Sequence, residues 1–179
     1  MNLKLIVIIL VLFSCTALPE TIGSIEELLN NRPSLCIDLL KKYEGFSDTA
    51  YPDPLTGGKP YTIGYGFTKI NGREVKQGDH LSREDADKLV HEIIEPYREA
   101  IDDTVKVALA WHQKEALTCF IYNVGTTNWS RSSALRLLNQ GKYKEAIRAT
   151  GLYVNPGTRI EQVLKKRRNA EKAMFLGQI

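Results

Sequence analysis

The sequence predicts an α+β fold with a small β-hairpin lobe and a larger helical lobe. Residues 43–68 interleave prolines and glycines with tyrosines and other strand-forming side chains, a pattern typical of short hairpins. Residues 86–101 carry apolar side chains at steps of three and four, which predicts a long amphipathic helix. Further helical segments with short loops follow from residue 105 onward. A chain of 179 residues is long enough for one domain with a substantial core, arranged in two lobes.

The hairpin segment follows a helix that is predicted to end at Glu44. One face of this helix is apolar, and it consists of Leu35, Cys36, Leu39, Leu40 and Tyr43. Gly45 then supplies the backbone freedom that a helix stop requires. Glu44 is therefore expected at a rigid position, where the hairpin segment begins.

Three polar side chains punctuate this part of the chain: Glu44, Asp53 and Thr62. Because Glu44 ends a helix and Asp53 lies on a loop, their two carboxyl groups can occupy different environments. Acid–base cleavage of a glycosidic bond requires such a pair, since one carboxyl donates a proton while the other, ionised, activates water. The hydroxyl of Thr62 is suited to help Asp53 hold that water.

The same segment contains an ordered motif made of Glu44-Gly45, Ala50-Tyr51, Asp53 and Thr62-Ile63-Gly64-Tyr65-Gly66. This motif resembles the active-site signature of the phage-type lysozymes, glycoside hydrolase family 24. The resemblance covers residues 35–177 and implies Glu44, Asp53 and Thr62 as the catalytic set. It also implies a lysozyme-like fold, in which a long helix joins the two lobes with a cleft between them. The loop 54–60 separates Asp53 and Thr62 by nine residues, more than in the shortest versions of the motif.

The resemblance implies hydrolysis of the β-1,4 bond between N-acetylmuramic acid and N-acetylglucosamine in peptidoglycan, with inversion. Glu44 would be the general acid, and Asp53 and Thr62 would place the water. The expected partner is the glycan strand, the expected state is a monomer, and no cofactor or metal is implied. Two alternatives stay open: a lysozyme-like module that binds glycan without cutting it, and a hydrolase of chitin-type oligosaccharides. A pure binding module has no need of all three catalytic residues.

Four further residues are expected around the catalytic set: Tyr51, Tyr65, Asn123 and Arg167. The run 122–125 resembles the Phe-Asn-Val-Gly corner that lines the cleft in the family, although a helix end at Gly125 would also explain it. Arg167 falls on the buried face of the last helix and so requires a carboxylate partner. Glu171 satisfies this at the next helical turn, and Glu44 is the partner that the resemblance favours.

Several helix boundaries are also predicted. Ser82 and Asp85 form a capping pair at the start of the long helix, and Pro96 is expected to kink or interrupt it. The last helix is predicted to begin at Thr158, with Glu161 in the capping position. Its apolar face is predicted from Ile160, Val163, Leu164, Ala170 and Met174, with Arg168 at the edge. The basic run 165–168 is interpreted as a solvated face, without a role in binding nucleic acid.

The N-terminal segment reads as an export signal over residues 1–17. Lys4 precedes nine consecutive apolar residues, and a stretch of small residues then ends in Ala17. The protein is therefore expected to be exported, either secreted or periplasmic. An uncleaved membrane anchor and lipidation of Cys15 are the alternatives, and no other contact with a membrane is expected. Residues 18–33 are interpreted as a spacer with a short helix, and residues 34–179 as the catalytic domain.

Charge and cysteine content add two expectations. The formal net charge of +3 suits an anionic polymer such as bacterial cell wall, and it is too small to indicate nucleic acid. Cys36 and Cys119 can pair in an exported protein, or they can pack as buried thiols. Sequence alone does not place their Cα atoms, so both readings stand.

Overall fold

The computed structural model describes residues 32–53 and 57–179. The export signal, the lipidation site at Cys15 and the helix expected in the spacer lie outside these residues. Within the described ranges, no helix combines the length and the apolar character needed to cross a membrane. Residues Ser34–Ile179 group into one unit, which contains both predicted lobes.

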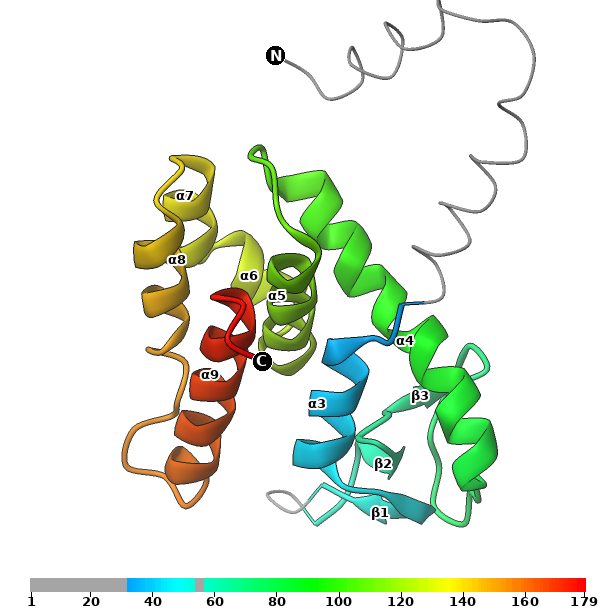
Figure 1. The fold of residues 1–179 in the computed structure, drawn as a ribbon. Coiled ribbons are helices and arrows are strands. Elements are labelled where there is room, and N and C mark those ends of the chain that lie inside the picture. The colour runs from blue at the N-terminus through cyan, green and yellow to red at the C-terminus, as the bar shows by residue number, and fades with distance from the viewer. Residues whose placement is uncertain (1–31, 54–56) are drawn as a thin grey trace, which may run out of the picture. The chain divides into compact units, whose positions relative to one another are not determined.

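Two hairpins form the small lobe, and they follow helix α3 (Leu35–Glu44) in the chain (Figure 1). This helix ends at Gly45, whose φ of 70° lies in the left-handed region. Strands β1 (Ser47–Pro52) and β2 (Tyr61–Gly64) then pair antiparallel. A second hairpin, β3 (Lys69–Ile70) and β4 (Arg73–Glu74), turns through Asn71 and Gly72, both with positive φ. The predicted helix stop and hairpin lobe are therefore confirmed.

Helix α4 (Arg83–Thr104) joins the two lobes, as Figure 1 shows. The hydroxyl of Ser82 accepts a hydrogen bond from the amide of Asp85, so the predicted cap is confirmed. The first half of the helix packs into the core of the small lobe, and Ile101 packs into the core of the helical lobe. Of the kink or interruption predicted at Pro96, the interruption is wrong, because the helix continues through this residue. Packing of the apolar stripe on both sides of Pro96 offsets the hydrogen bond that proline removes.

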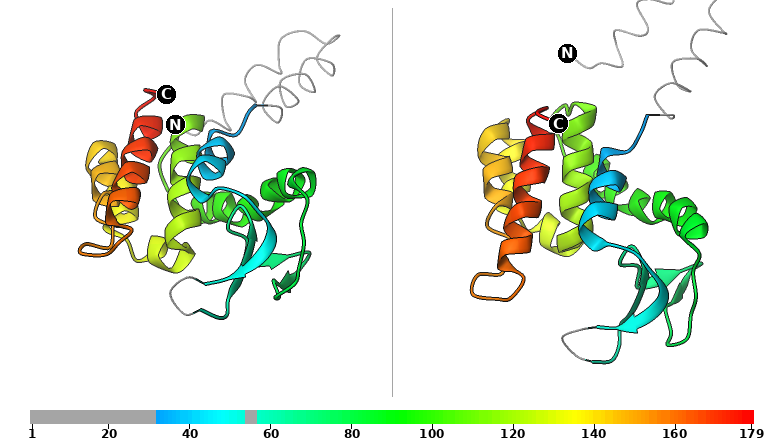
Figure 2. Two further views of the ribbon diagram at one scale, coloured as in Figure 1. Left: turned by 90° about the horizontal axis from the view of Figure 1, so that it is seen from below. Right: turned by 60° about the horizontal axis from the view of Figure 1, so that its bottom comes forward.

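The helical lobe surrounds α5 (Trp111–Val124), whose residues 115–121 are all buried. The other helices of this lobe are α6 (Thr126–Ser130), α7 (Ser133–Asn139), α8 (Tyr143–Thr150) and α9 (Glu161–Phe175). Figure 2 shows α3, α5 and α9 side by side, and α5 contacts both of its neighbours. The end of α5 therefore faces the end of α3, where Glu44 lies.

Helix α9 differs from the prediction at its start and in its buried face. It begins at Glu161, because the hydroxyl of Thr158 donates to the carbonyl of Asn155 and the carboxylate of Glu161 accepts from the amide of Gly157, at 2.7 Å in both cases. Val163 is 52% exposed. The buried residues are Arg167, Arg168, Glu171, Met174 and Phe175. The expected burial of Arg167 is therefore confirmed, whereas the interpretation of residues 165–168 as a solvated face fails for Arg168.

Cys36 and Cys119 are free thiols, and both are completely buried. The thiol of Cys119 donates to the carbonyl of Cys36 at 3.3 Å. The neighbouring Cys36 side chain, followed by burial, raises the pKa of the Cys119 thiol well above its usual range. The structure therefore agrees with the reading of these residues as packed thiols.

Candidate active site

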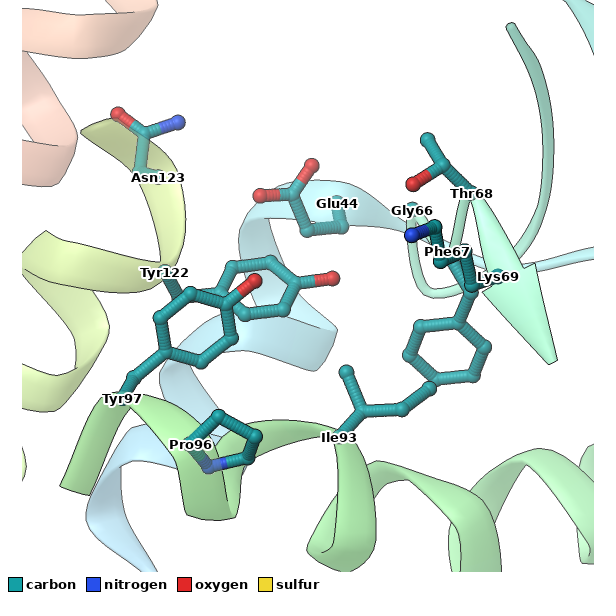
Figure 3. A pocket seen from close by; sticks show the side chains of 10 residues that line it. All are labelled: Glu44, Gly66, Phe67, Thr68, Lys69, Ile93, Pro96, Tyr97, Tyr122 and Asn123. Atoms are coloured by element: carbon teal, nitrogen blue, oxygen red, sulfur yellow. The ribbon is translucent and has the colours of Figure 1, made fainter. Parts of the chain in front are cut away.

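A cavity of about 520 Å³ lies where the small lobe meets the helical lobe (Figure 3). It is lined by the end of α3, the segment between β2 and β3, the middle of α4 and the end of α5. The lining residues are Glu44, Gly66, Phe67, Thr68, Lys69, Ile93, Pro96, Tyr97, Tyr122 and Asn123. Among the described residues, no group of three or more histidine, cysteine or acidic side chains is placed to hold a metal ion.

Glu44 is held at the cavity by a cation from the other end of the chain. The guanidinium Nη1 of Arg167 donates to Oε1 of Glu44, so the contact favoured by the family resemblance is present. Nε of Arg167 also lies 3.2 Å from Oε1 of Glu171, the alternative partner considered from the sequence. Arg167 is only 4% exposed, so its charge is fixed between two carboxylates.

Gly66 allows the backbone to pass close to Glu44. Its φ is +87°, and a Cβ atom at this position would lie 3.3 Å from Oε2 of Glu44. A larger residue would be strained by its backbone angle and would press on the carboxylate. The glycine of the motif therefore leaves space for the carboxyl group of Glu44.

Tyr122 connects the two lobes beside Glu44. Its hydroxyl donates to the backbone carbonyl of Tyr65 at 3.0 Å. Burial, followed by the nearby charge of Glu44, raises the pKa of this hydroxyl, so that it remains a donor. The side chain of Tyr65 is buried and donates to Asp87 at 2.6 Å. Tyr65 therefore serves the site through its backbone, and Asn123 and Tyr122 line the cavity directly.

The other predicted catalytic residues lie on the β1–β2 hairpin. Thr62 pairs with Tyr51 across the hairpin, so their side chains share one face. Asp53 follows β1, and its amide donates to the carbonyl of Gly58 at 3.0 Å, which ties down the start of the loop. Burial, followed by the charge of Glu44, raises the pKa of the Tyr51 hydroxyl. Asp53 and Thr62 themselves are not among the residues that line the cavity.

A buried ion network supports the helical side of the cavity. Arg168 donates through Nη2 to Oδ1 of Asn123 at 2.6 Å, and the same nitrogen lies 3.2 Å from Oε1 of Glu171. Glu171 is completely buried, and this burial outweighs both arginines and raises its pKa to about 7. The sequence analysis placed Arg168 at the edge of the apolar face of the last helix and did not predict its contact with Asn123. The sequence did contain a signal for this buried cluster, because Glu171 follows Arg167 by four positions and Arg168 by three.

Comparisons with known proteins agree on one family. The family model described as phage lysozyme matches residues 41–171. The endolysin of Salmonella phage P22 is 36% identical over 141 residues, which cover 78% of this chain and 94% of that protein. The endolysin of Bacillus phage B103 is 34% identical over 140 residues, again 78% of this chain, but the match spans only 52% of that relative.

Solved structures have the same fold. A crystal structure of a P22 lysozyme mutant superposes with a TM-score of 0.68 at 34% identity, covering 80% of this chain and 97% of that one. An endolysin from the Escherichia coli phage FAHEc1 gives a TM-score of 0.73 at 26% identity, covering 83% and 96% respectively. The predicted lysozyme-like α+β architecture is therefore confirmed.

Proposed function

Because this chain belongs to the phage lysozyme family, we propose that it is a muramidase that cleaves the β-1,4 bond between N-acetylmuramic acid and N-acetylglucosamine in peptidoglycan. It is a glycoside hydrolase of the lysozyme type. The assignment of Glu44 as the acid rests on its position in the cavity between the lobes, where Arg167 aligns its carboxylate.

Glu44 is the general acid in this proposal. It protonates the glycosidic oxygen as the bond breaks, which leaves a carboxylate beside Arg167. The buried guanidinium stabilises that negative charge because the two groups are in direct contact and largely shielded from water. Gly66 leaves room for the carboxyl group to stand at the cavity wall without a side chain in front of it.

Asp53 and Thr62 place and activate the attacking water. Thr62 shares its hairpin face with Tyr51, and burial together with the charge of Glu44 raises the pKa of the Tyr51 hydroxyl. An ionised carboxylate that stands back from the sugar leaves room for water, and attack by that water inverts the anomeric configuration. The Thr62 hydroxyl suits this arrangement because it can both donate to and accept from the water.

Clearing of purified peptidoglycan by the Glu44→Gln variant tests the proposal. Glutamine keeps the shape of the side chain but has no acidic proton, so we expect the rate to fall by at least about 10²-fold with the fold intact. Glu99→Gln is the matched control, because it makes the same chemical change at an exposed position of α4. Clearing by Glu44→Gln at the rate of the control would contradict the acid assignment. Binding of wall without cleavage by the wild type would identify a binding module.

Residues 1–17 serve as an export signal in the same proposal, which would deliver the enzyme to the cell wall. The supporting features are the single lysine, the apolar run and the small residues that end at Ala17. Intact-mass measurement after expression in an exporting bacterium should show a chain that starts at Leu18. A full-length product in the membrane fraction would favour the anchor, and added lipid mass on Cys15 would favour the lipoprotein.

A further inference from the structure

We propose that Arg168 is a positioning residue that fixes Asn123 as a hydrogen-bond donor for the acetamido carbonyl of the bound glycan. The inference rests on the proposed muramidase function, and it adds a determinant of substrate selection to the same cleft.

The orientation of the Asn123 amide follows from its partner. Arg168 Nη2 lies 2.6 Å from Oδ1 of Asn123, and a guanidinium has donors but no acceptor. The amide oxygen must therefore face Arg168, and the NH₂ group is left for the cavity. Figure 3 shows the nitrogen of Asn123 on the side of the amide that faces Glu44. In the described part of the chain, the bond to Arg168 is the one side-chain hydrogen bond that Asn123 makes.

Besides its bond to Asn123, Arg168 makes two further contacts. Its side chain is almost completely buried, and its guanidinium carbon lies 4.9 Å from the centre of the Phe120 ring. Nη2 is also 3.2 Å from the buried carboxylate of Glu171. A donor locked in this way cannot follow the amide if it rotates, so Arg168 imposes one orientation on Asn123. An exposed partner such as a surface lysine would allow both.

The same carboxylate oxygen links this arrangement to the acid. Oε1 of Glu171 is 3.2 Å from Nε of Arg167, which holds Glu44, and 3.2 Å from Nη2 of Arg168, which holds Asn123. One buried group therefore sets the relative position of the proton donor and of an amide donor on the neighbouring wall. A fixed distance between these two groups suits a sugar whose glycosidic oxygen must lie next to Glu44 while the Asn123 amide binds another part of it.

The chemistry of the glycan indicates what the amide donor recognises. Each N-acetylated sugar carries an acetamido carbonyl, which is a strong hydrogen-bond acceptor. Removal of the acetyl group leaves an ammonium group at neutral pH, which has donors only. The NH₂ of Asn123 can pair with the first group but not with the second. The wild type should therefore favour acetylated glycan, and about threefold to tenfold of that preference, the usual range for one hydrogen bond, should come from Asn123.

The test compares kcat/KM on purified wall glycan with kcat/KM on the same glycan after partial chemical N-deacetylation. Asn123→Ala should reduce the ratio of the two values by about threefold to tenfold. Asn123→Asp keeps an acceptor for Arg168 but replaces the cavity donor with a second acceptor, so it should reduce the ratio further. Arg168→Met should reduce the ratio in the wild-type background, and it should change nothing more in the Asn123→Ala background.

Several outcomes would overturn the inference. Equal rates of the wild type on both glycans would do so, as would a ratio that Asn123→Asp leaves unchanged. An effect of Arg168→Met on the ratio that persists in the Asn123→Ala background would show that Arg168 acts by another route. If urea titrations show that Arg168→Met is not folded, the two Asn123 variants still decide whether Asn123 donates a hydrogen bond to the acetamido group. A wild type that cleaves neither glycan would contradict the proposed function itself.

Discussion

Glu44 and Asp53 take part in the same proposed reaction, but they lie in two regions whose structures are stabilised in different ways. Glu44 is held by Arg167, which lies 123 residues away in sequence and is buried with Glu171 and Arg168. Asp53 and Thr62 are placed by the backbone pairing of one short hairpin and by the hydrogen bonds of its loop. The acid side therefore depends on the tertiary fold, and the water side depends on local structure.

This difference suits the two tasks. A proton donor is effective only when its carboxyl group is aligned with the bond that breaks, and buried charges restrict such a group strongly. A water molecule can adjust its position between two side chains, so a more exposed hairpin is sufficient. Substitutions on the acid side should therefore affect stability and activity together, and substitutions on the water side should affect activity alone.

The largest expected effect is that of Arg167→Met. Methionine fills much of the space but leaves Glu171 buried with one fewer cation and Glu44 without its partner. Breaking a buried ion pair in this way typically destabilises a protein by about 3–5 kcal/mol. Urea unfolding should show this loss, whereas Lys166→Met, the same kind of change at the exposed neighbouring position, should stay within about 0.5 kcal/mol of the wild type. Equal effects of the two variants would contradict the claim that buried charges hold the acid side.

On the water side, Asp53→Asn should separate activity from stability. The substitution removes the carboxylate charge that activates water, and we expect the rate of wall clearing to fall by at least about 10²-fold. The free energy of unfolding should change by about 0.5 kcal/mol or less. Asp48→Asn, at an exposed position on β1, serves as the control for both measurements. A loss of stability comparable with that of Arg167→Met would remove the contrast between the two sides.

Tyr122→Phe should give a smaller effect that sharpens the comparison. It removes the hydroxyl that donates to the Tyr65 carbonyl between the lobes, which should cost about 0.5–1.5 kcal/mol. Tyr51→Phe on the hairpin makes the same change at a side chain that is 36% exposed and should stay within about 0.5 kcal/mol. Thermal or urea unfolding of both variants provides the measurement. A larger loss for Tyr51→Phe would mean that the hairpin face is more tightly integrated than its exposure indicates.

The sequence predicted the local side of the site well. The end of α3 at Gly45, the β1–β2 hairpin and the cap at Ser82 all depend on residues close together in the chain, where turn and capping preferences act. The burial of Arg168 and the true face of α9 were missed. The projection put Arg167 on the buried face but left Arg168 at its edge, because it does not show that two adjacent arginines can share one buried carboxylate. The contact between Arg168 and Asn123 exists only once α5 and α9 are packed together.

The division of the reaction between Glu44 as acid and Asp53 with Thr62 as the water-placing pair can be tested through the stereochemistry of the first product. Proton NMR spectra, recorded in the first minutes of cleavage of a β-linked oligosaccharide and before mutarotation, distinguish the two anomers. Attack by a water held on the hairpin side inverts the sugar carbon, so the account predicts that the α-anomer appears first. Initial appearance of the β-anomer, or a glycosyl ester trapped on Asp53, would contradict it.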